Sequence, residues 1–213
     1  MKKFHGWLLA IVKITGFLPA MIFFKPKITY EDKNGPKGSK VFKGPVMLVS
    51  NHKKLLDLPL YMMAFPFATF RFLIAEVMYN KGKLFSWFLD HIGGIEVDRN
   101  NFKFGFIAES TEVLDDGGTV AIFPAGRLPV DGKDFPFKPS VTVIAKQSGA
   151  PVIPVYTDGN YGLFKRTHIV VGKKMHVEDL KAEGTNEREI NDSLTKKLEQ
   201  KVMSLAELIE KKE

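Results

Sequence analysis

The chain has 213 residues, enough for one domain with a sizeable core. Its hydrophobic share of 45% and charged share of 26% are typical of a globular protein and exclude wholesale disorder. It contains no cysteine, which excludes disulfides, thiolate metal sites and a cysteine nucleophile. The net charge of +7 comes mostly from lysine. It suits an anionic partner such as an acidic membrane or nucleic acid, and the alternative is that the lysines are simply solvated on the surface.

The first 24 residues consist of two lysines followed by an apolar run, without a clear signal-peptide cleavage site. Helical spacing places Lys2 and Lys13 opposite a wide apolar stripe, and Pro19 is expected to kink or break the helix. The stripe consists of Phe4, Trp7, Ile11, Ile14, Leu18 and Ile22.

We therefore predict that residues 1–30 form an amphipathic membrane anchor with its lysines toward the head groups. The expected location is the inner face of the cytoplasmic membrane, and the expected partner is the lipid surface. A soluble core helix and a single membrane span are the alternatives, and Lys13 at the centre of the run argues against a span.

A Gly/Pro/Lys-rich segment, 31–45, is predicted to link the anchor to a domain at 46–213. In that domain, near-continuous apolar strands alternate with helices, which predicts a single α/β domain with a largely parallel mixed sheet flanked by helices. A C-terminal amphipathic helix from Asn186 is expected to pack on it. The predicted strands are 46–50, 70–75, 94–98, 119–123, 151–156 and 168–172, and the other helices lie near 58–68, 82–90, 102–115 and 139–148.

Ligands of open α/β sheets bind beyond the carboxyl ends of the strands, where His52 follows the first of these strands. Asp57 begins a predicted helix five residues later, so the chain can fold back and bring its carboxylate to the imidazole. Such a pair suits a general base. A metal site is disfavoured because the other histidines show no supporting spacing, and a histidine that merely caps a strand is the remaining alternative.

Two of the five arginines also follow predicted strands. Arg99 comes after G-G-I-E-V-D, and Arg127 comes after the F-P-A-G turn. Arginine recognises phosphate through two parallel hydrogen bonds, and turn N–H groups add to such a site. Each arginine alone could be a structural salt bridge, but together beside a His–Asp pair they favour a phosphorylated substrate.

The order N-H-x4-D, G-x-x-x-V-D-R, F-P-x-G-R and V-I-P-V, spread over residues 45–157, resembles the four motifs of the glycerolipid acyltransferase family. That family is typified by lysophosphatidate acyltransferases, and an N-terminal membrane-binding segment is one of its traits. The resemblance implies transfer of a fatty acyl group from acyl-CoA or acyl carrier protein to the free hydroxyl of a lysophospholipid acceptor. It implies no cofactor and no covalent acyl-enzyme.

The resemblance also assigns roles to residues. It makes His52 the base that deprotonates the acceptor hydroxyl and Asp57 the carboxylate that orients it. The remaining motif residues are expected to bind substrate, with Arg99 and the turn at 123–127 holding the acceptor phosphate. They are Asn51, Arg99, Phe123, Pro124, Ala125, Gly126, Arg127 and Pro154.

Ala125 departs from the family pattern, which has glutamate at this position. Three explanations are open: an engineered inactivating substitution, a natural member with reduced or altered activity, or a site where glutamate is dispensable. The first is favoured because the neighbours of Ala125 keep the family form. The alternative function is a catalytically silent lipid-binding protein on the same scaffold. A nucleic-acid-binding module is disfavoured because no recognition-helix or aromatic-platform signature is present.

Overall fold

The computed structural model describes residues 6–98 and 105–210. A seven-stranded sheet with the order β1-β7-β6-β2-β5-β3-β4 forms its centre, and all paired strands are parallel except β6 and β7. The strands are β1 (Lys27–Tyr30), β2 (Val46–Ser50), β3 (Phe70–Ala75), β4 (Gly94–Val97), β5 (Thr119–Ile122), β6 (Val152–Thr157) and β7 (His168–Val171).

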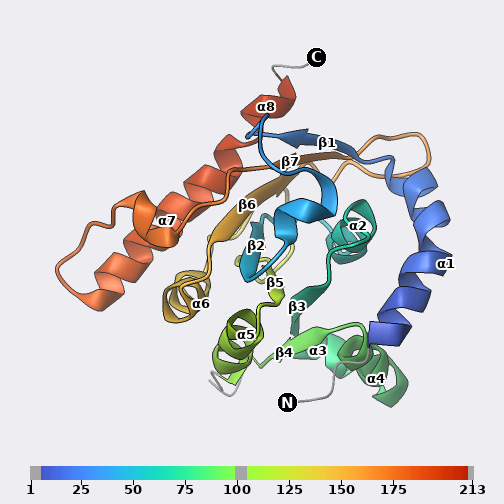
Figure 1. Cartoon of the computed structure of the whole chain (residues 1–213), viewed down its shortest axis with the longest axis horizontal. Helices are drawn as coiled ribbons and strands as arrows, with labels where there is room; N and C mark the ends of the chain where they lie inside the picture. Colours follow the sequence, from blue (N-terminus) through green and yellow to red (C-terminus); the bar gives the residue numbers. More distant parts are fainter. Residues whose placement is uncertain (1–5, 99–104, 211–213) are drawn as a thin grey trace.

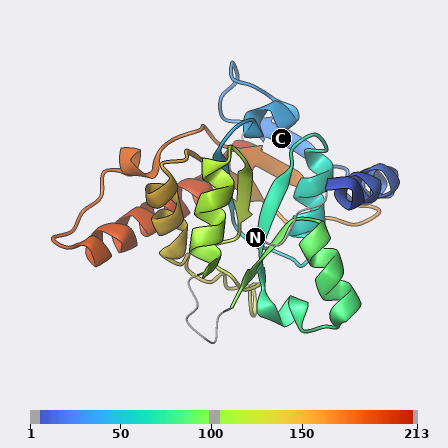
Figure 2. The ribbon, with the colours of Figure 1, turned by 60° about the horizontal axis from the view of Figure 1, so that its bottom comes forward.

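Helices cover both faces of the sheet (Figures 1 and 2). One face carries α1 (Gly6–Phe24), α2 (Asp57–Ala64), α3 (Glu76–Tyr79) and α4 (Lys83–His91). The other carries α5 (Gly105–Asp115), α6 (Ser140–Ser148) and α7 (Glu187–Ser204). Three short elements complete the chain: the 3-10 turns η1 (Gly38–Phe42) and η2 (Val177–Leu180), and α8 (Glu207–Glu210).

The two faces enclose two apolar cores that meet at β2, whose five residues are all buried. Val46 and Leu48 point into the core beneath α1 and α2, whereas Met47 and Val49 point into the core beneath α5 and α6. This alternation explains why β2 is an uninterrupted apolar run: both of its sides are covered.

The predicted fold class is confirmed: the domain is α/β with a mostly parallel mixed sheet between helices, preceded by an apolar helix. Each of the six predicted strands is present, with ends within one residue of those expected. The C-terminal helix begins at Asn186, whose side chain accepts a hydrogen bond from the Glu189 N–H, and it packs on the domain through buried Leu194, Leu198 and Val202.

The N-terminal helix α1 lies beside α2 (Figure 2). Its apolar stripe faces solvent. The described stripe residues Trp7, Ile11, Ile14, Leu18 and Ile22 are all exposed, and Ile14 is 78% exposed. Within the described residues, α1 is also the one helix long and apolar enough to cross a membrane, although core helices and signal sequences meet that test too.

Two expectations about α1 need correction. The helix does not break at Pro19 but continues to Phe24, while a kink at Pro19 stays a prediction. Lys13 does not point toward lipid head groups, because its ammonium donates to the carbonyls of Pro66 (2.9 Å) and Ala68 (2.6 Å) in the loop after α2. Lys13 thus ties α1 to the domain, while Lys2 lies outside the described residues.

The strand β1 is not predicted by the sequence. It pairs in parallel with β7 and forms one edge of the sheet. In the following segment, Val41 and Phe42 of η1 are buried, and the Phe42 ring packs against Phe65 and Phe70. The division of the chain at residues 30 and 45 stays a prediction, but β1 and η1 attach both N-terminal segments to the sheet and its core.

We expect Leu48→Ala, in the centre of β2, to lower the free energy of unfolding by about 2–5 kcal/mol, because it leaves a cavity where both faces of the sheet are packed. Urea unfolding followed by circular dichroism measures this. The matched control is Ile14→Ala on the exposed stripe, which should change the free energy by less than about 0.5 kcal/mol. Equal losses of unfolding free energy in both variants would contradict the placement of Leu48 in the core and of Ile14 on the surface.

Candidate active site

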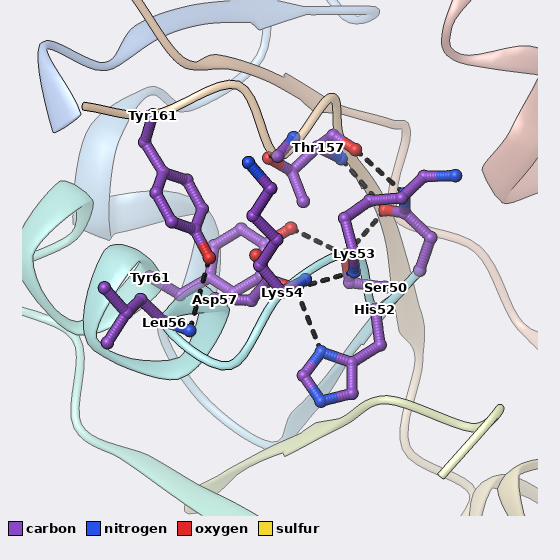
Figure 3. A network of polar contacts seen from close by, with 11 residues as sticks. Ser50, His52, Lys53, Lys54, Leu56, Asp57, Tyr61, Thr157 and Tyr161 are labelled. Carbon is purple, nitrogen blue, oxygen red and sulfur yellow. Dashed lines mark hydrogen bonds and ion pairs between the residues drawn. The ribbon is translucent and has the colours of Figure 1, made fainter. Parts of the chain in front are cut away.

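The loop between β2 and α2 is organised by the carboxylate of Asp57, which is fully buried (Figure 3). One oxygen, Oδ2, accepts three hydrogen bonds: from His52 Nδ1 at 2.9 Å, the Lys53 N–H at 2.7 Å and the Lys54 N–H at 2.9 Å. The chain can turn back on itself because Asp57 is the first residue of α2. The predicted His52–Asp57 contact is therefore present.

This contact sets the state of the imidazole. A carboxylate can only accept a hydrogen bond, so the Asp57 partner places a proton on His52 Nδ1. In the neutral ring the other nitrogen, Nε2, carries the lone pair, and that edge of the ring points away from Asp57 (Figure 3). The His52 side chain is 18% exposed, so the ring is partly accessible. The arrangement is that of a general base held in one tautomer.

The imidazole also stacks on the first residue of the F-P-A-G-R turn. The rings of His52 and Phe123 lie 4.4 Å apart at an angle of 19°, and Tyr61 of α2 stacks on Phe123 from 6.0 Å. A carboxylate on one ring nitrogen and an aromatic face on the ring plane leave His52 little freedom to rotate. The first and third sequence motifs therefore meet at His52.

Asn51 joins the ends of β2 and β6. Its side-chain Nδ2 donates to the Thr157 carbonyl at 2.8 Å, and its Oδ1 accepts from the Thr157 N–H at 2.9 Å. Asn51 and Thr157 are both buried, so these bonds satisfy backbone groups that water cannot reach. Asn51, expected to bind substrate, thus fixes the strand end from which His52 projects.

Two tyrosines flank the carboxylate. Tyr161 accepts from the Leu56 N–H at 3.2 Å, and Tyr61 shares a hydrogen bond of 2.6 Å with Ser50. Burial, and then the negative charge of Asp57, raises the pKa of both phenols well above the ordinary range. Both tyrosines therefore remain neutral at physiological pH.

The F-P-A-G-R turn follows β5. Its bend is closed by the Gly126 N–H, which donates to the Phe123 carbonyl at 2.9 Å, and Gly126 has a left-handed φ of 64°. Pro124 and Ala125 are buried, whereas Arg127 is exposed and its guanidinium lies 5.8 Å from the centre of the Phe135 ring. The turn thus presents its arginine to solvent and its alanine to the core.

The other predicted site residues lie apart from this cluster. Pro154 is buried within β6, opposite Val49, so it belongs to the interior of the sheet rather than its edge. Arg99 lies outside the described residues. Asp98, the residue before it, lines a cavity next to the turn.

That cavity has a volume of about 480 Å³ and lies at the carboxyl ends of β3, β4 and β5, against α5 and the start of α6. Most of its lining is apolar, including Leu73, Phe106 and Ile107, while Lys138 and Asp98 add charged groups. Phe123 lines the cavity and also stacks on His52, so the cavity and the imidazole share one wall.

Sequence reasoning missed Tyr161 and the His52–Phe123 stacking, because neither follows from spacing along one segment. It also missed a second histidine–carboxylate pair, in which His168 Nδ1 lies 3.0 Å from Asp158 Oδ2. Their ten-residue separation gives no signal until β6 and β7 are known to be antiparallel neighbours.

Among the described residues, no group of three histidine or acidic side chains could hold a metal ion.

The α/β domain and the carboxylate-bound His52 beside the Phe-Pro-x-Gly turn agree with the fold and the motif arrangement that the acyltransferase resemblance implies. A family model described as Acyltransferase matches residues 27–158, and the chain belongs to this family. The resemblance of its four motifs is thereby confirmed.

One curated relative agrees with this assignment, and one solved structure shares the fold. The 1-acyl-sn-glycerol-3-phosphate acyltransferase BAT2, chloroplastic, of Brassica napus is 25% identical over 156 residues, which is 72% of this chain but 42% of the relative. The chain thus spans less than half the length of that curated relative. The crystal structure of the 1-acyl-sn-glycerophosphate (LPA) acyltransferase PlsC from Thermotoga maritima has the same fold, with a TM-score of 0.60, 22% identity and coverage of 93% of this chain and 78% of that one.

We expect the protein to lose stability above about pH 10, the ordinary tyrosine pKa. Because the pKa values of Tyr61 and Tyr161 are raised in the folded chain, the unfolded chain releases these protons first, and stability falls as pH rises from there toward the folded pKa values. Each tyrosine contributes a slope of about 1.4 kcal/mol per pH unit. Urea unfolding at a series of alkaline pH values measures this slope, and Tyr161→Phe should reduce it. An unchanged slope in Tyr161→Phe would contradict the raised pKa assigned to Tyr161.

Proposed function

We propose that the chain transfers a fatty acyl group from a thioester donor, acyl-CoA or acyl carrier protein, to the free hydroxyl of lysophosphatidate, giving phosphatidate. The observation that carries this proposal is the His52 imidazole, held through Nδ1 by buried Asp57 with Nε2 on the opposite side. Family membership supports the reaction class, and the name of the Brassica napus relative supports the acceptor.

In the proposed mechanism, His52 Nε2 takes the proton of the acceptor hydroxyl as its oxygen attacks the thioester carbonyl. Asp57 stabilises the imidazolium that forms, since its Oδ2 lies 2.9 Å from Nδ1. The carbon–sulfur bond then breaks, and the imidazolium returns the proton to the departing thiolate. The products are an ester and a free thiol, with no acyl group on the protein.

The phosphate of the acceptor is assigned to Arg99 and the turn at 123–127. Arg127 suits this role because it is exposed and its guanidinium lies over the Phe135 ring. The neighbouring cavity suits the acyl chain of an amphiphile, because its walls are apolar and Lys138 and Asp98 contribute charge. Asn51 and Pro154 are proposed to contribute indirectly, by fixing the positions of β2 and β6.

Membrane association at the inner face of the cytoplasmic membrane fits this acceptor, because a lysophospholipid resides in the bilayer. The support is the exposed apolar stripe of α1. We propose an interfacial position rather than a span, because α1 is packed along α2 and its only central lysine is bound to the domain.

A second candidate function is a catalytically silent lipid-binding protein, and the observation that favours it is Ala125. This residue is 6% exposed and packs in the core beneath α5 and α6, so the turn carries no acid to orient Arg127 or Arg99. The same cavity and membrane surface would serve lipid binding without turnover.

We expect His52→Ala to abolish acyl transfer from acyl-CoA to lysophosphatidate. The release of free thiol measures this transfer. General base catalysis contributes about 10²–10⁴-fold, so any remaining rate should be at least a hundredfold lower. The matched control is His168→Ala, which removes the imidazole of the other His–Asp pair and should keep the activity. Full activity in His52→Ala would overturn the general-base assignment.

We expect Ala125→Glu, which restores the family residue, to raise kcat/KM by about 10- to 100-fold. A carboxylate is unfavourable in the core that Ala125 contacts, so the glutamate should turn outward to a basic partner, and a charged hydrogen bond contributes about 1.5–3 kcal/mol. Ala125→Gln has the same shape without the charge and should raise it far less. Circular dichroism verifies that both variants fold. If neither parent nor Ala125→Glu releases thiol while lysophosphatidate still binds, the silent lipid-binding function replaces the enzymatic one.

A further inference from the structure

The loop between β6 and β7 exposes a second apolar group beside the anchor helix. Leu163 and Phe164 form the tip of a turn in this loop, and the Phe164 side chain is 100% exposed. Lys165 and Arg166 follow at once and are also exposed. We name the five residues Gly162–Arg166, with the sequence G-L-F-K-R, the apolar loop.

The apolar loop is held in this shape rather than free. The Lys165 N–H donates to the Gly162 carbonyl at 3.0 Å and closes the turn, while Gly162 has a φ of 149°, which side chains rarely allow. Thr167, the next residue, is fully buried. The two large apolar side chains are therefore presented to solvent by a fixed backbone, which is unfavourable in water unless another surface covers them.

The loop is also fixed to the carboxyl end of α1 (Figure 1). The Gly162 N–H donates to the Phe23 carbonyl at 3.2 Å, and the Thr167 N–H donates to the Phe24 carbonyl at 3.0 Å. The Lys25 ammonium adds a bond of 2.6 Å to the Leu163 carbonyl. Gly162 at the start of the loop and Thr167 just after its end are thus both hydrogen-bonded to the helix whose apolar stripe is exposed.

We propose that the apolar loop is a second membrane contact, in which Leu163 and Phe164 enter a leaflet containing anionic lipids and Lys165 and Arg166 bind the head groups. Apolar side chains followed by basic ones match the depth order of such a leaflet: hydrocarbon inside, negative charge at its surface. The net charge of +7 favours the same surface. The proposal rests on the proposed membrane association of α1 but assigns a separate element.

This contact would lie next to the catalytic loop. The residue before the apolar loop, Tyr161, packs its ring against Phe23 and Phe24 and holds the Leu56 N–H through its hydroxyl. Leu55 and Leu56, on the loop that carries His52, are exposed as well. The leaflet would therefore meet the protein at the edge where an acceptor lipid must enter.

The absence of cysteine from the chain allows one position at a time to be labelled with an environment-sensitive fluorophore. Phe164→Cys reports on the apolar loop, Ile14→Cys on the exposed face of α1, and Ala182→Cys on an exposed loop before α7, far from α1 in Figure 1. The probe is a vesicle of phosphatidylcholine and phosphatidylglycerol. We expect a blue shift, and quenching by nitroxide-labelled lipid, at positions 164 and 14 but not at 182.

A response at position 14 without one at position 164 would overturn the proposal, and so would an equal response at position 182, which signals general adsorption. The assay needs no turnover, so it can be repeated in His52→Ala. In that variant we expect thiol release to be lost and the response at position 164 to be unchanged. The failure of the proposed function can therefore be distinguished from the failure of this contact.

The basic residues of the loop are tested by reversing their charge. We expect Lys165→Glu with Arg166→Glu to weaken binding to the anionic vesicles by about tenfold or more, with little change for phosphatidylcholine alone. The matched control is Lys173→Glu with Lys174→Glu, which changes the net charge equally at the other end of β7. An equal loss of affinity in both double variants would contradict a specific role for the loop.

Discussion

The three hydrogen bonds that converge on one carboxylate oxygen of Asp57 hold the loop between β2 and α2 in its shape. A fully buried carboxylate is unfavourable without partners, and here two backbone N–H groups and an imidazole supply them. The same oxygen therefore stabilises the turn and selects the histidine tautomer. A substitution at Asp57 would leave all three donors without this partner, so its effects on folding and on the orientation of His52 are coupled.

The sheet brings to this loop the side chains that the chain order keeps apart. Asn51 ties the end of β2 to the end of β6, and Phe123 comes from the strand on the other side of β2. Because β5, β2 and β6 are parallel neighbours, their carboxyl ends meet at one edge. The motifs are distant in sequence, but they form one site because of this strand order.

Buried strands could be predicted closely from the sequence because each is an apolar run bounded by turn residues, and the His52–Asp57 contact followed from a helix start at Asp57. The edge strand β1 could not, since Lys27–Tyr30 is short, alternates in character and becomes a strand only by pairing with β7. Lys13 was misjudged for a related reason. Its partners are two backbone carbonyls more than fifty residues away, and helical periodicity contains no information about them.

The helix α1 and the strand β1 are separated only by Lys25 and Pro26. Under the proposed membrane association of α1, so short a connection would keep the domain close to the bilayer surface while the helix lies on lipid. The proposed acceptor lipid would then reach the protein by lateral diffusion in two dimensions. The proposed thioester donor would approach from the opposite, aqueous side.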